Sequence, residues 1–358
     1  MAFVIWYYKG KSLFNYIVYM KILVTGGLGF IGSHTVVELV NAGYDPVIID
    51  DLSNSNIKIL DQLAKIIGYK PDFYQLDLCD EKAVKDFAAK ESDIAGIIHF
   101  AASKAVGESV KQPLKYYRNN FYSLINILGA YNGKALNFVF SSSCTVYGQP
   151  DSLPVTEDAP VKPAESPYGN TKQIAEEILK DVVAAGTKYK VIALRYFNPV
   201  GAHDSALIGE LPNGVPQNLV PFITQTAIGK REKITVFGDT YNTPDGSCIR
   251  DYIHVVDLAK AHVAAIKLME RESFTGYDVF NIGTGTGSSV LEVITAFEKV
   301  TGVKLKYEIG PARDGDVEQV WGDVTKSTKK LNWKADLDLN TMMSSAWEWE
   351  NYIAQNPL

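Results

Sequence analysis

The sequence is poor in cysteine and lacks the histidine spacings that bind metal ions. It has 3 cysteines among 358 residues, and Cys79, Cys144 and Cys248 lie far apart and outside any CxxC pair. This argues against a disulfide framework and a zinc site, and it fits a reducing, cytoplasmic location. The 5 histidines form neither an HxH nor an HExxH pattern, so we predict no metal site.

An excess of positive charge and a long hydrophobic run are also missing. The formal net charge is −6 and the pI is about 5.5, with lysine and arginine scattered, so we expect neither nucleic acid nor a membrane as a partner. Apolar and aromatic side chains dominate the N-terminal segment, but Lys9, Gly10 and Lys11 interrupt them. The segment falls short of the roughly 20 apolar residues that span a bilayer, and it lacks a secretory cleavage pattern. These absences favour small-molecule chemistry in a soluble protein.

The chain does have a regular alternation of β-branched runs and helical stretches. With 46% hydrophobic and 21% charged residues it has the composition of a globular protein. The alternation begins at Met20 and has no repeat period, which indicates an α/β fold with a Rossmann-type doubly wound parallel sheet. The predicted strands are residues 21–26, 45–50, 71–77, 96–101, 136–142 and 190–196. The predicted helices are residues 30–42, 56–68, 80–90, 115–132 and 167–185.

Three glycines follow the first predicted strand, at the start of a helix. Gly26, Gly29 and Gly32 form GxxGxxG within TGGLGFIGSH, a pattern that allows a tight turn and a close approach of the backbone to a pyrophosphate. Asp50 ends the second strand, where its carboxylate can accept hydrogen bonds from an adenosine ribose. Because no arginine follows in residues 51–53, the pattern favours NAD over NADP.

The character of the sequence changes after Asn198. Residues 199–217 are rich in glycine and proline, and the remainder mixes helices with short strands. We expect residues 1–19 to be an extension outside the fold, residues 20–198 to be an NAD-binding Rossmann domain, and residues 199–350 to be a smaller C-terminal α/β lobe for the substrate. Some crossover of the chain between the two lobes is expected. Short strands are predicted in the second lobe at residues 234–238, 278–283 and 305–309.

A tyrosine and a lysine stand four residues apart just after a predicted helix start, SPYGNTK. This spacing places Tyr168 and Lys172 on one helix face, about 40° apart around the axis. A tyrosine is a weak base at neutral pH, but a neighbouring ammonium and an oxidised nicotinamide both favour its phenolate. Ser143 ends the serine run after the fifth strand and can hydrogen-bond the hydroxyl that Tyr168 deprotonates. Tyr168, Lys172 and Ser143 are therefore the candidate catalytic residues.

A series of motifs, in this order, carries a resemblance to a known family: TGGLGFIG, FAASKAVGES, SSSCTVYG, SPYGNTK, LRYFNPVGAH and RDYIHVVDLA. With them the chain resembles the extended short-chain dehydrogenase/reductase family, in particular its UDP-hexose 4-epimerases. The resemblance implies an NAD-dependent isomerase of galactose metabolism, which reversibly epimerises UDP-galactose and UDP-glucose at C4 through a transient 4-keto intermediate. It also implies that Tyr168 takes the proton of the sugar 4-hydroxyl, that Lys172 contacts the nicotinamide ribose, and that Ser143 binds near the reacting oxygen.

The resemblance implies further ligand contacts by motif position. NAD would be held by Gly26, Gly29, Phe30, Ile31, Gly32, Asp50, Asp51, Leu52, Ser53, Asn54, Ser55, Asp77, Leu78, Phe100, Ala101, Ala102, Ser103, Lys104, Asn119, Ser143, Tyr168, Lys172 and Phe197. The UDP-hexose would be held by Ser143, Thr145, Tyr168, Asn198, Asn218, Leu219, Thr235, Val236, Phe237, Arg250, Arg313, Asp316 and Val320.

One departure from the family pattern bears on the substrate. Val320 precedes Trp321, where members restricted to UDP-glucose and UDP-galactose tend to carry a tyrosine. We therefore expect a pocket that also admits UDP-GalNAc and UDP-GlcNAc. Family members also lead us to expect a homodimer through the helices at residues 105–130 and 170–185.

Other interpretations stay open at this point. A UDP-pentose 4-epimerase differs by a single hydroxymethyl group on its substrate. A nucleotide-sugar 4,6-dehydratase usually needs an Asp-Glu pair, where this chain has Cys144 and Thr145. An NAD-binding scaffold without catalysis would normally have lost Tyr168 or Lys172.

Overall fold

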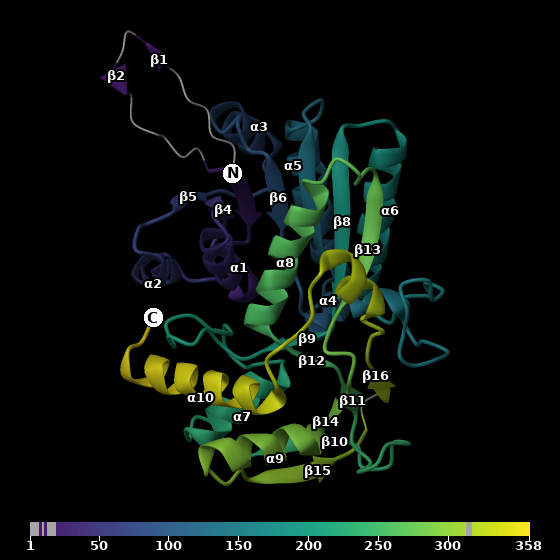
Figure 1. Ribbon diagram of the computed structural model, residues 1–358. Helices are drawn as coiled ribbons and strands as arrows, with labels where there is room; N and C mark the ends of the chain where they lie inside the picture. Colours follow the sequence, from purple (N-terminus) through teal and green to yellow (C-terminus); the bar gives the residue numbers. More distant parts are fainter. Residues whose placement is uncertain (1–6, 9–10, 13–18, 313–316) are drawn as a thin grey trace.

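A seven-stranded parallel sheet forms the centre of the protein (Figure 1). The computed structural model describes residues 7–8, 11–12, 19–312 and 317–358. The strand order is β13-β8-β7-β6-β3-β4-β5, which is the Rossmann order with one additional strand at the edge. This confirms the predicted fold class. The strands are β3 (Lys21–Thr25), β4 (Asp45–Asp50), β5 (Asp72–Gln75), β6 (Gly96–His99), β7 (Leu136–Ser143), β8 (Tyr189–Tyr196) and β13 (Tyr277–Ile282).

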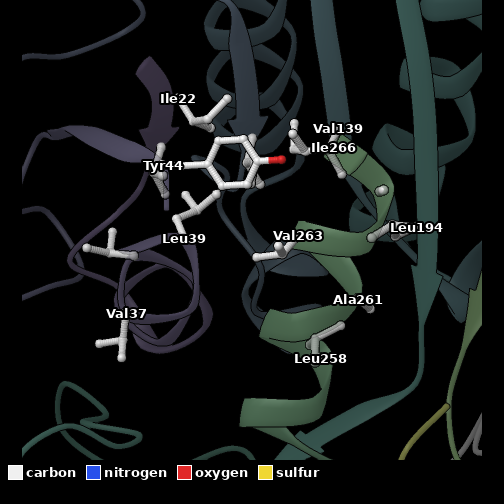
Figure 2. Close-up of a cluster of buried hydrophobic side chains, with 14 of the residues drawn as sticks. Ile22, Val37, Leu39, Tyr44, Val139, Leu194, Leu258, Ala261, Val263 and Ile266 are labelled. Atoms are coloured by element: carbon white, nitrogen blue, oxygen red, sulfur yellow. The ribbon is translucent and has the colours of Figure 1, made fainter. Parts of the chain in front are cut away.

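Helices cover both faces of this sheet because its side chains alternate between two apolar cores. Ile22 and Val24 pack into one core with α1, α2 and α8, whereas Leu23 packs into the other with α3, α5 and α6. Figure 2 shows the first core, where Val263 and Ile266 of α8 lie near Tyr44. The helices are α1 (Phe30–Asn41), α2 (Lys58–Ile67), α3 (Glu81–Lys90), α4 (Val106–Lys111), α5 (Pro113–Ala130), α6 (Pro167–Ala184) and α8 (Val255–Met269), and a 3₁₀ turn, η1 (Cys144–Tyr147), follows β7.

A second lobe lies beyond the carboxyl ends of the sheet strands (Figure 1). Its core joins α7, α9, α10 and short strands through residues such as Ile223, Phe297 and Met343. It contains α7 (Leu219–Ala227), α9 (Val290–Thr301), α10 (Leu339–Gln355), β9 (Asn198–Val200), β10 (Ile234–Phe237), β11 (Ile249–Arg250), β12 (Tyr252–His254), β14 (Ser288–Ser289), β15 (Tyr307–Gly310) and β16 (Gln319–Val320). The short helical turn η2 (Ser327–Leu331) instead packs against α8 and β13 of the first lobe. Near the N-terminus, β1 (Tyr7–Tyr8) pairs with β2 (Lys11–Ser12) in a two-stranded sheet of their own.

The chain returns to the first lobe after it has entered the second. Helix α8 packs against α1, and β13 runs parallel to β8 from the Tyr277–Val191 pair to the Ile282–Tyr196 pair. This strand was predicted as part of the second lobe; the structure instead places it at the edge of the main sheet. The reason is that Phe280 and Ile282 are fully buried there, so the strand is one of the expected crossovers.

Candidate active site

The glycine loop after β3 is packed too tightly for any larger residue. A Cβ atom on Gly32 would lie 2.3 Å from the carbonyl oxygen of Gly26. Gly26 itself has a φ of +68°, which favours glycine. Gly29 is the N-cap of α1 and carries no side chain in front of the first turn. The free N–H groups of this helix start are therefore accessible to an anion such as a pyrophosphate.

Asp50 connects the glycine loop to the loop that follows β4. Its Oδ2 accepts a hydrogen bond from the Leu28 N–H at 3.0 Å, and its Oδ1 accepts from the Leu52 N–H at 3.0 Å and from Ser55 Oγ at 2.7 Å. Asp50 is 6% exposed. The carboxylate therefore shapes both loops, and its predicted contact with a ribose stays a prediction.

The segment after β6 lies against the glycine loop. A Cβ on Gly26 would meet the Ala101 backbone nitrogen at 3.0 Å, so residues 100–104 line the same crevice, where the order of the strands reverses between β3 and β6. The sequence analysis missed Asn120, next to the predicted Asn119. The Asn120 side chain accepts from the Ser103 N–H at 2.8 Å and donates to Thr171 Oγ1 at 3.0 Å. No motif around Asn120 predicts that it links this loop to α6.

Helix α6 positions the candidate catalytic pair. Ser166 caps it by accepting a hydrogen bond from the Gly169 N–H at 3.1 Å, and Pro167 occupies its first turn. The Lys172 ammonium lies 5.9 Å from the centre of the Tyr168 ring and donates to the Ser141 carbonyl at 2.5 Å. Ser143, at the end of β7, lies close enough to Tyr168 for its hydroxyl to lower the pKa of the tyrosine. The structure thus brings Tyr168, Lys172 and Ser143 together, as predicted.

Burial dominates the electrostatics of this group. It raises the pKa of Tyr168 to about 12, and the hydrogen bond with Ser143 acts in the opposite direction. Burial lowers the pKa of Lys172 to about 7, while the negative charge of Glu176 raises it. A buried lysine close to neutral pH can switch between its charged and neutral forms with little free energy. In this structure Ser143 is the contact that favours the phenolate.

Some of the predicted sugar residues lie close to η1, the turn that follows Ser143. Thr145, in η1, has a buried Oγ1 without a hydrogen-bond partner among the described residues, so its hydroxyl is available to a ligand. Arg250 and Val320 are paired residues on neighbouring strands β11 and β16. Phe197 and Val320 belong to one apolar cluster, which places the predicted nicotinamide neighbour beside the predicted sugar wall.

Other predicted ligand-binding residues differ in which of their atoms can contact a ligand. Val236 is buried in the core of the second lobe and Leu78 in the core of the first, so only their backbone can contact a ligand. Asn218 precedes the first turn of α7 without a side-chain capping hydrogen bond, and its Nδ2 donates to Glu210 Oε1 at 2.6 Å. Arg313 and Asp316 lie outside the described residues.

Asp251 is a further residue that sequence reasoning missed. Without the family resemblance, its position beside Arg250 would indicate a surface ion pair. It is in fact fully buried, and its carboxylate accepts hydrogen bonds from the Thr284 N–H at 2.8 Å and the Gly285 N–H at 3.1 Å. Its backbone carbonyl accepts from the Asn198 N–H at 2.9 Å. Asp251 therefore anchors the loops on both sides of the predicted substrate residues.

The protein combines a Rossmann sheet and a glycine-rich loop with an acidic residue at the end of the second strand and a Ser-Tyr-Lys group. This combination defines an enzyme of the short-chain dehydrogenase/reductase type. A family model described as GDP-mannose 4,6 dehydratase matches residues 23–346. The UDP-glucose 4-epimerase of Bacillus subtilis (strain 168) is 49% identical over 335 residues, which are 93% of this chain and 97% of that protein. That of Dictyostelium discoideum is 48% identical over 334 residues, 92% of this chain and 96% of that one.

Solved structures of UDP-glucose 4-epimerases have the same fold as this chain. A UDP-glucose 4-epimerase from Stenotrophomonas maltophila with bound NAD and formylated UDP-arabinopyranose superposes with a TM-score of 0.90 at 44% identity, covering 94% of this chain and 100% of that chain. The UDP-glucose 4-epimerase from Bifidobacterium longum in complex with NAD+ and UDP superposes with a TM-score of 0.88 at 45% identity. The match covers 94% of this chain and 99% of that chain. The chain belongs to the NAD-dependent epimerase/dehydratase family, the extended short-chain dehydrogenases/reductases, among the UDP-glucose 4-epimerases.

Proposed function

We propose that this protein is an NAD-dependent UDP-glucose 4-epimerase, which interconverts UDP-galactose and UDP-glucose in galactose metabolism. The observation that carries the proposal is the buried group of Tyr168, Ser143 and Lys172 beside the hydroxyl of Thr145, which has no hydrogen-bond partner among the described residues. Relatives with 46 to 49% identity over about nine tenths of the chain carry the same name, which supports the proposal.

The residues present fit NAD. The cradle at Gly26 and Gly32 leaves room only for backbone, as a bound pyrophosphate requires, and the start of α1 offers N–H groups to it. A bound NAD would supply hydride transfer at C4 of the sugar, with return of the hydride to the opposite face of that carbon.

The protein's own residues handle the proton and the orientation of the sugar. Tyr168 Oη accepts the proton of the 4-hydroxyl and returns it to the C4 oxygen. Ser143 keeps the tyrosine hydroxyl in place, and the charged form of Lys172 favours the phenolate. The Thr145 hydroxyl, which has no partner in the described part of the chain, can hydrogen-bond the sugar. The apolar cluster of Phe197 and Val320 excludes water from this side.

A dehydratase is disfavoured, although the matched family model bears that description. Elimination of water needs an acid and a base near the reacting carbons, and the turn that follows Ser143, η1 (Cys144–Tyr147), carries no carboxylate. A UDP-pentose 4-epimerase and a scaffold that only binds NAD are separated from the proposal by the experiment below.

We also propose that the sugar pocket admits N-acetylated hexoses. Val320 is 7% exposed and lies in the same cluster as Phe197. A valine at this position leaves more room than the tyrosine found in hexose-restricted relatives, so UDP-GalNAc and UDP-GlcNAc are within the proposed range.

A homodimer through α5 and α6 is proposed as the assembly. Leu114, Arg118, Tyr122 and Ile125 follow one another at helical spacing on α5, and Leu114 is 81% exposed. Such a continuous exposed stripe suits a helix of a second copy. Light scattering of the purified protein should give twice the chain mass of 39.5 kDa; the monomer mass would contradict the proposal.

Location and domain limits are proposed on two observations. The free cysteines Cys79, Cys144 and Cys248 suit the cytoplasm, a reducing compartment. Among the described residues no helix is long and apolar enough to cross a membrane. Strands β1 and β2 pair only with each other in the described part of the chain, which supports a catalytic fold that begins at Met20. Residues 20–198 and 199–350 are the proposed NAD-binding and UDP-sugar lobes, with α8 and β13 of the second range returning to the first lobe.

The test is conversion of UDP-galactose to UDP-glucose by the purified protein without added NAD. We expect activity in the parent and its loss in Tyr168→Phe. Tyr117→Phe is the control, because Tyr117 Oη accepts a hydrogen bond from Asn170 near the start of the same helix, α6. Full activity of Tyr168→Phe would overturn the mechanism. Faster turnover of UDP-xylose than of UDP-galactose would indicate the pentose enzyme, and bound NAD that no UDP-sugar reduces would indicate a scaffold.

A further inference from the structure

A buried ion pair lies directly behind the candidate catalytic residues. The side chains of Glu176 on α6 and Arg195 on β8 are 4% and 3% exposed. They share two hydrogen bonds, from Arg195 Nε to Oε1 at 2.9 Å and from Nη2 to Oε2 at 2.6 Å. Glu176 stands one turn beyond Lys172 on the same helix face. Desolvation makes such a pair a poor source of stability, so its position calls for another explanation.

The pair holds the serine run of β7. Ser142 Oγ donates to Glu176 Oε1 at 2.6 Å, and the next residue, Ser143, carries the hydroxyl that lowers the pKa of Tyr168. On the other side of Ser142, the Ser141 carbonyl accepts from Lys172. Two contacts from α6 therefore fix the backbone that presents Ser143 to Tyr168.

The same pair connects to the wall of the sugar site. The Arg195 guanidinium lies 4.8 Å from the centre of the Tyr147 ring. Tyr147 Oη donates to Asn281 Oδ1 at 2.6 Å, and Asn281 Nδ2 donates to the Val155 carbonyl at 2.8 Å. The Val155 N–H donates to the Trp321 carbonyl at 2.9 Å. This chain of contacts ends beside β16.

We propose that Glu176 and Arg195 are positioning residues for the reaction, which hold Ser143 in line with Tyr168 and tie this group to β16. The proposal rests on the proposed function for its activity readout. Glu176 also acts by charge, because its carboxylate favours the protonated form of Lys172. The other titratable groups around this lysine are Tyr168 on α6, His99 on β6, and Arg195 and Tyr196 on β8.

The test compares Glu176→Gln and Arg195→Lys with the parent, each as the NAD-bound protein. We expect kcat to fall about 10- to 100-fold in both variants, with a smaller change in KM, because a small misplacement of Ser143 is costly. The alkaline limb of the kcat–pH profile should move to lower pH in Glu176→Gln, since Lys172 then loses its proton earlier. It should not move in Arg195→Lys, which keeps Glu176.

Tyr277→Phe is the matched control. It removes the 3.2 Å hydrogen bond from Tyr277 Oη to the same carboxylate but leaves the serine run untouched, so kcat should stay within about twofold of the parent. Parent-like kcat and pH profiles in Glu176→Gln and Arg195→Lys would overturn the proposal, whatever happens to their melting temperatures.

Two further measurements keep the test decisive. If Glu176→Gln does not fold because Arg195 is left uncompensated, Glu176→Leu with Arg195→Met removes both charges; kcat should still fall, and a parent-like value overturns the proposal. An ultraviolet difference titration of Tyr168, with Tyr168→Phe as the blank, needs no turnover and so separates this proposal from the proposed function. We expect a higher midpoint in Glu176→Gln, because this variant displaces Ser143, the contact that lowers the pKa of Tyr168. An equal midpoint would overturn the proposal.

Discussion

At the scale of single residues, Thr145 is the clearest case of a side chain kept for a ligand. Its Oγ1 is buried without a hydrogen-bond partner in the described structure. Thr145→Val therefore removes the free-energy cost of burying this hydroxyl and breaks no hydrogen bond of the Oγ1 atom within the described structure. We expect the free energy of unfolding to stay within about 1 kcal/mol of the parent or to rise. The value of kcat/KM for UDP-galactose should fall about threefold to tenfold, as loss of one hydrogen bond predicts.

Thr224→Val is the control for this change. The Thr224 hydroxyl donates to Glu350 at 3.0 Å inside the second lobe, so its loss leaves a buried carboxylate short of a donor. We expect urea unfolding to show a loss of about 1 to 3 kcal/mol with kcat/KM unchanged. The role of Thr145 would be refuted by the opposite pattern, lower stability and parent-like kinetics.

Val320 decides the substrate range at the same scale. Val320→Tyr fills the space beside Phe197, and we expect turnover of UDP-GalNAc to drop about 100-fold more than that of UDP-galactose. Val215→Tyr, at a position that is 66% exposed, should leave both rates unchanged. A parent turnover of UDP-GalNAc below about 1% of that of UDP-galactose would count against a roomy pocket.

The residues that sequence could predict are those whose role follows from local spacing. Tyr168 and Lys172 share a helix face by their separation alone, and Asp50 ends a strand by its place in the alternation. Glu176 and Arg195 could not be paired this way, because their contact joins a helix to a strand 19 positions away. Asp251 was missed for a related reason: its partners at Thr284 and Gly285 reach it only after the chain has folded back.

At the scale of elements, the N-cap of α6 affects both stability and activity. Ser166→Ala removes the acceptor of the Gly169 N–H, and we expect a loss of about 1 kcal/mol in the free energy of unfolding. Because Tyr168 lies in the same first turn, kcat should also fall, about tenfold. Chemical denaturation and initial rates measure the two effects.

Asp338→Ala removes the corresponding cap of α10, where Asp338 accepts from the Thr341 N–H at 2.8 Å. We expect a comparable loss of stability without a change in kcat, because α10 lies in the second lobe. If both variants kept the parent kcat, the cap of α6 would have no role in placing Tyr168.

Element boundaries were predicted closely where turn chemistry marks them. The predicted helix at 167–185 is α6 (Pro167–Ala184), which starts at a Ser-Pro pair, and the predicted strand at 45–50 is β4 (Asp45–Asp50). The helix predicted from residue 56 begins instead at Lys58, since Asn56 accepts a hydrogen bond from the Lys58 N–H and so lies before the first turn. The position of β13 in the main sheet could not be predicted from local sequence, because its partner β8 lies about 80 residues earlier in the chain.

At the scale of the whole molecule, the buried histidines make stability sensitive to acid. Burial lowers the pKa of His34 and His99 to about 3, and that of His254 and His262 to about 4. In the unfolded chain these groups gain a proton near pH 6.5. Between pH 6.5 and about 4 the unfolded state therefore binds more protons, so the free energy of unfolding falls as pH falls.

His262→Phe tests this dependence. The ring lies 4.7 Å from that of Phe100, and its Nε2 has no partner in the described structure, so a phenyl group is a suitable replacement. Urea denaturation across this pH range should show that the free energy of unfolding falls less steeply with decreasing pH in the variant than in the parent. Equal slopes would mean that His262 does not contribute.

The return of the chain at α8 and β13 also sets an order of assembly during synthesis. The last sheet strand and the helix that covers β7 and β8 come from residues 255–282, which leave the ribosome only after the first part of the second lobe, from β9 to β12. Until then Val139, Ile192 and Leu194 have no cover on one face. A nascent chain that pauses near residue 200 would carry an unfinished sheet, which is where we expect a chaperone to be needed.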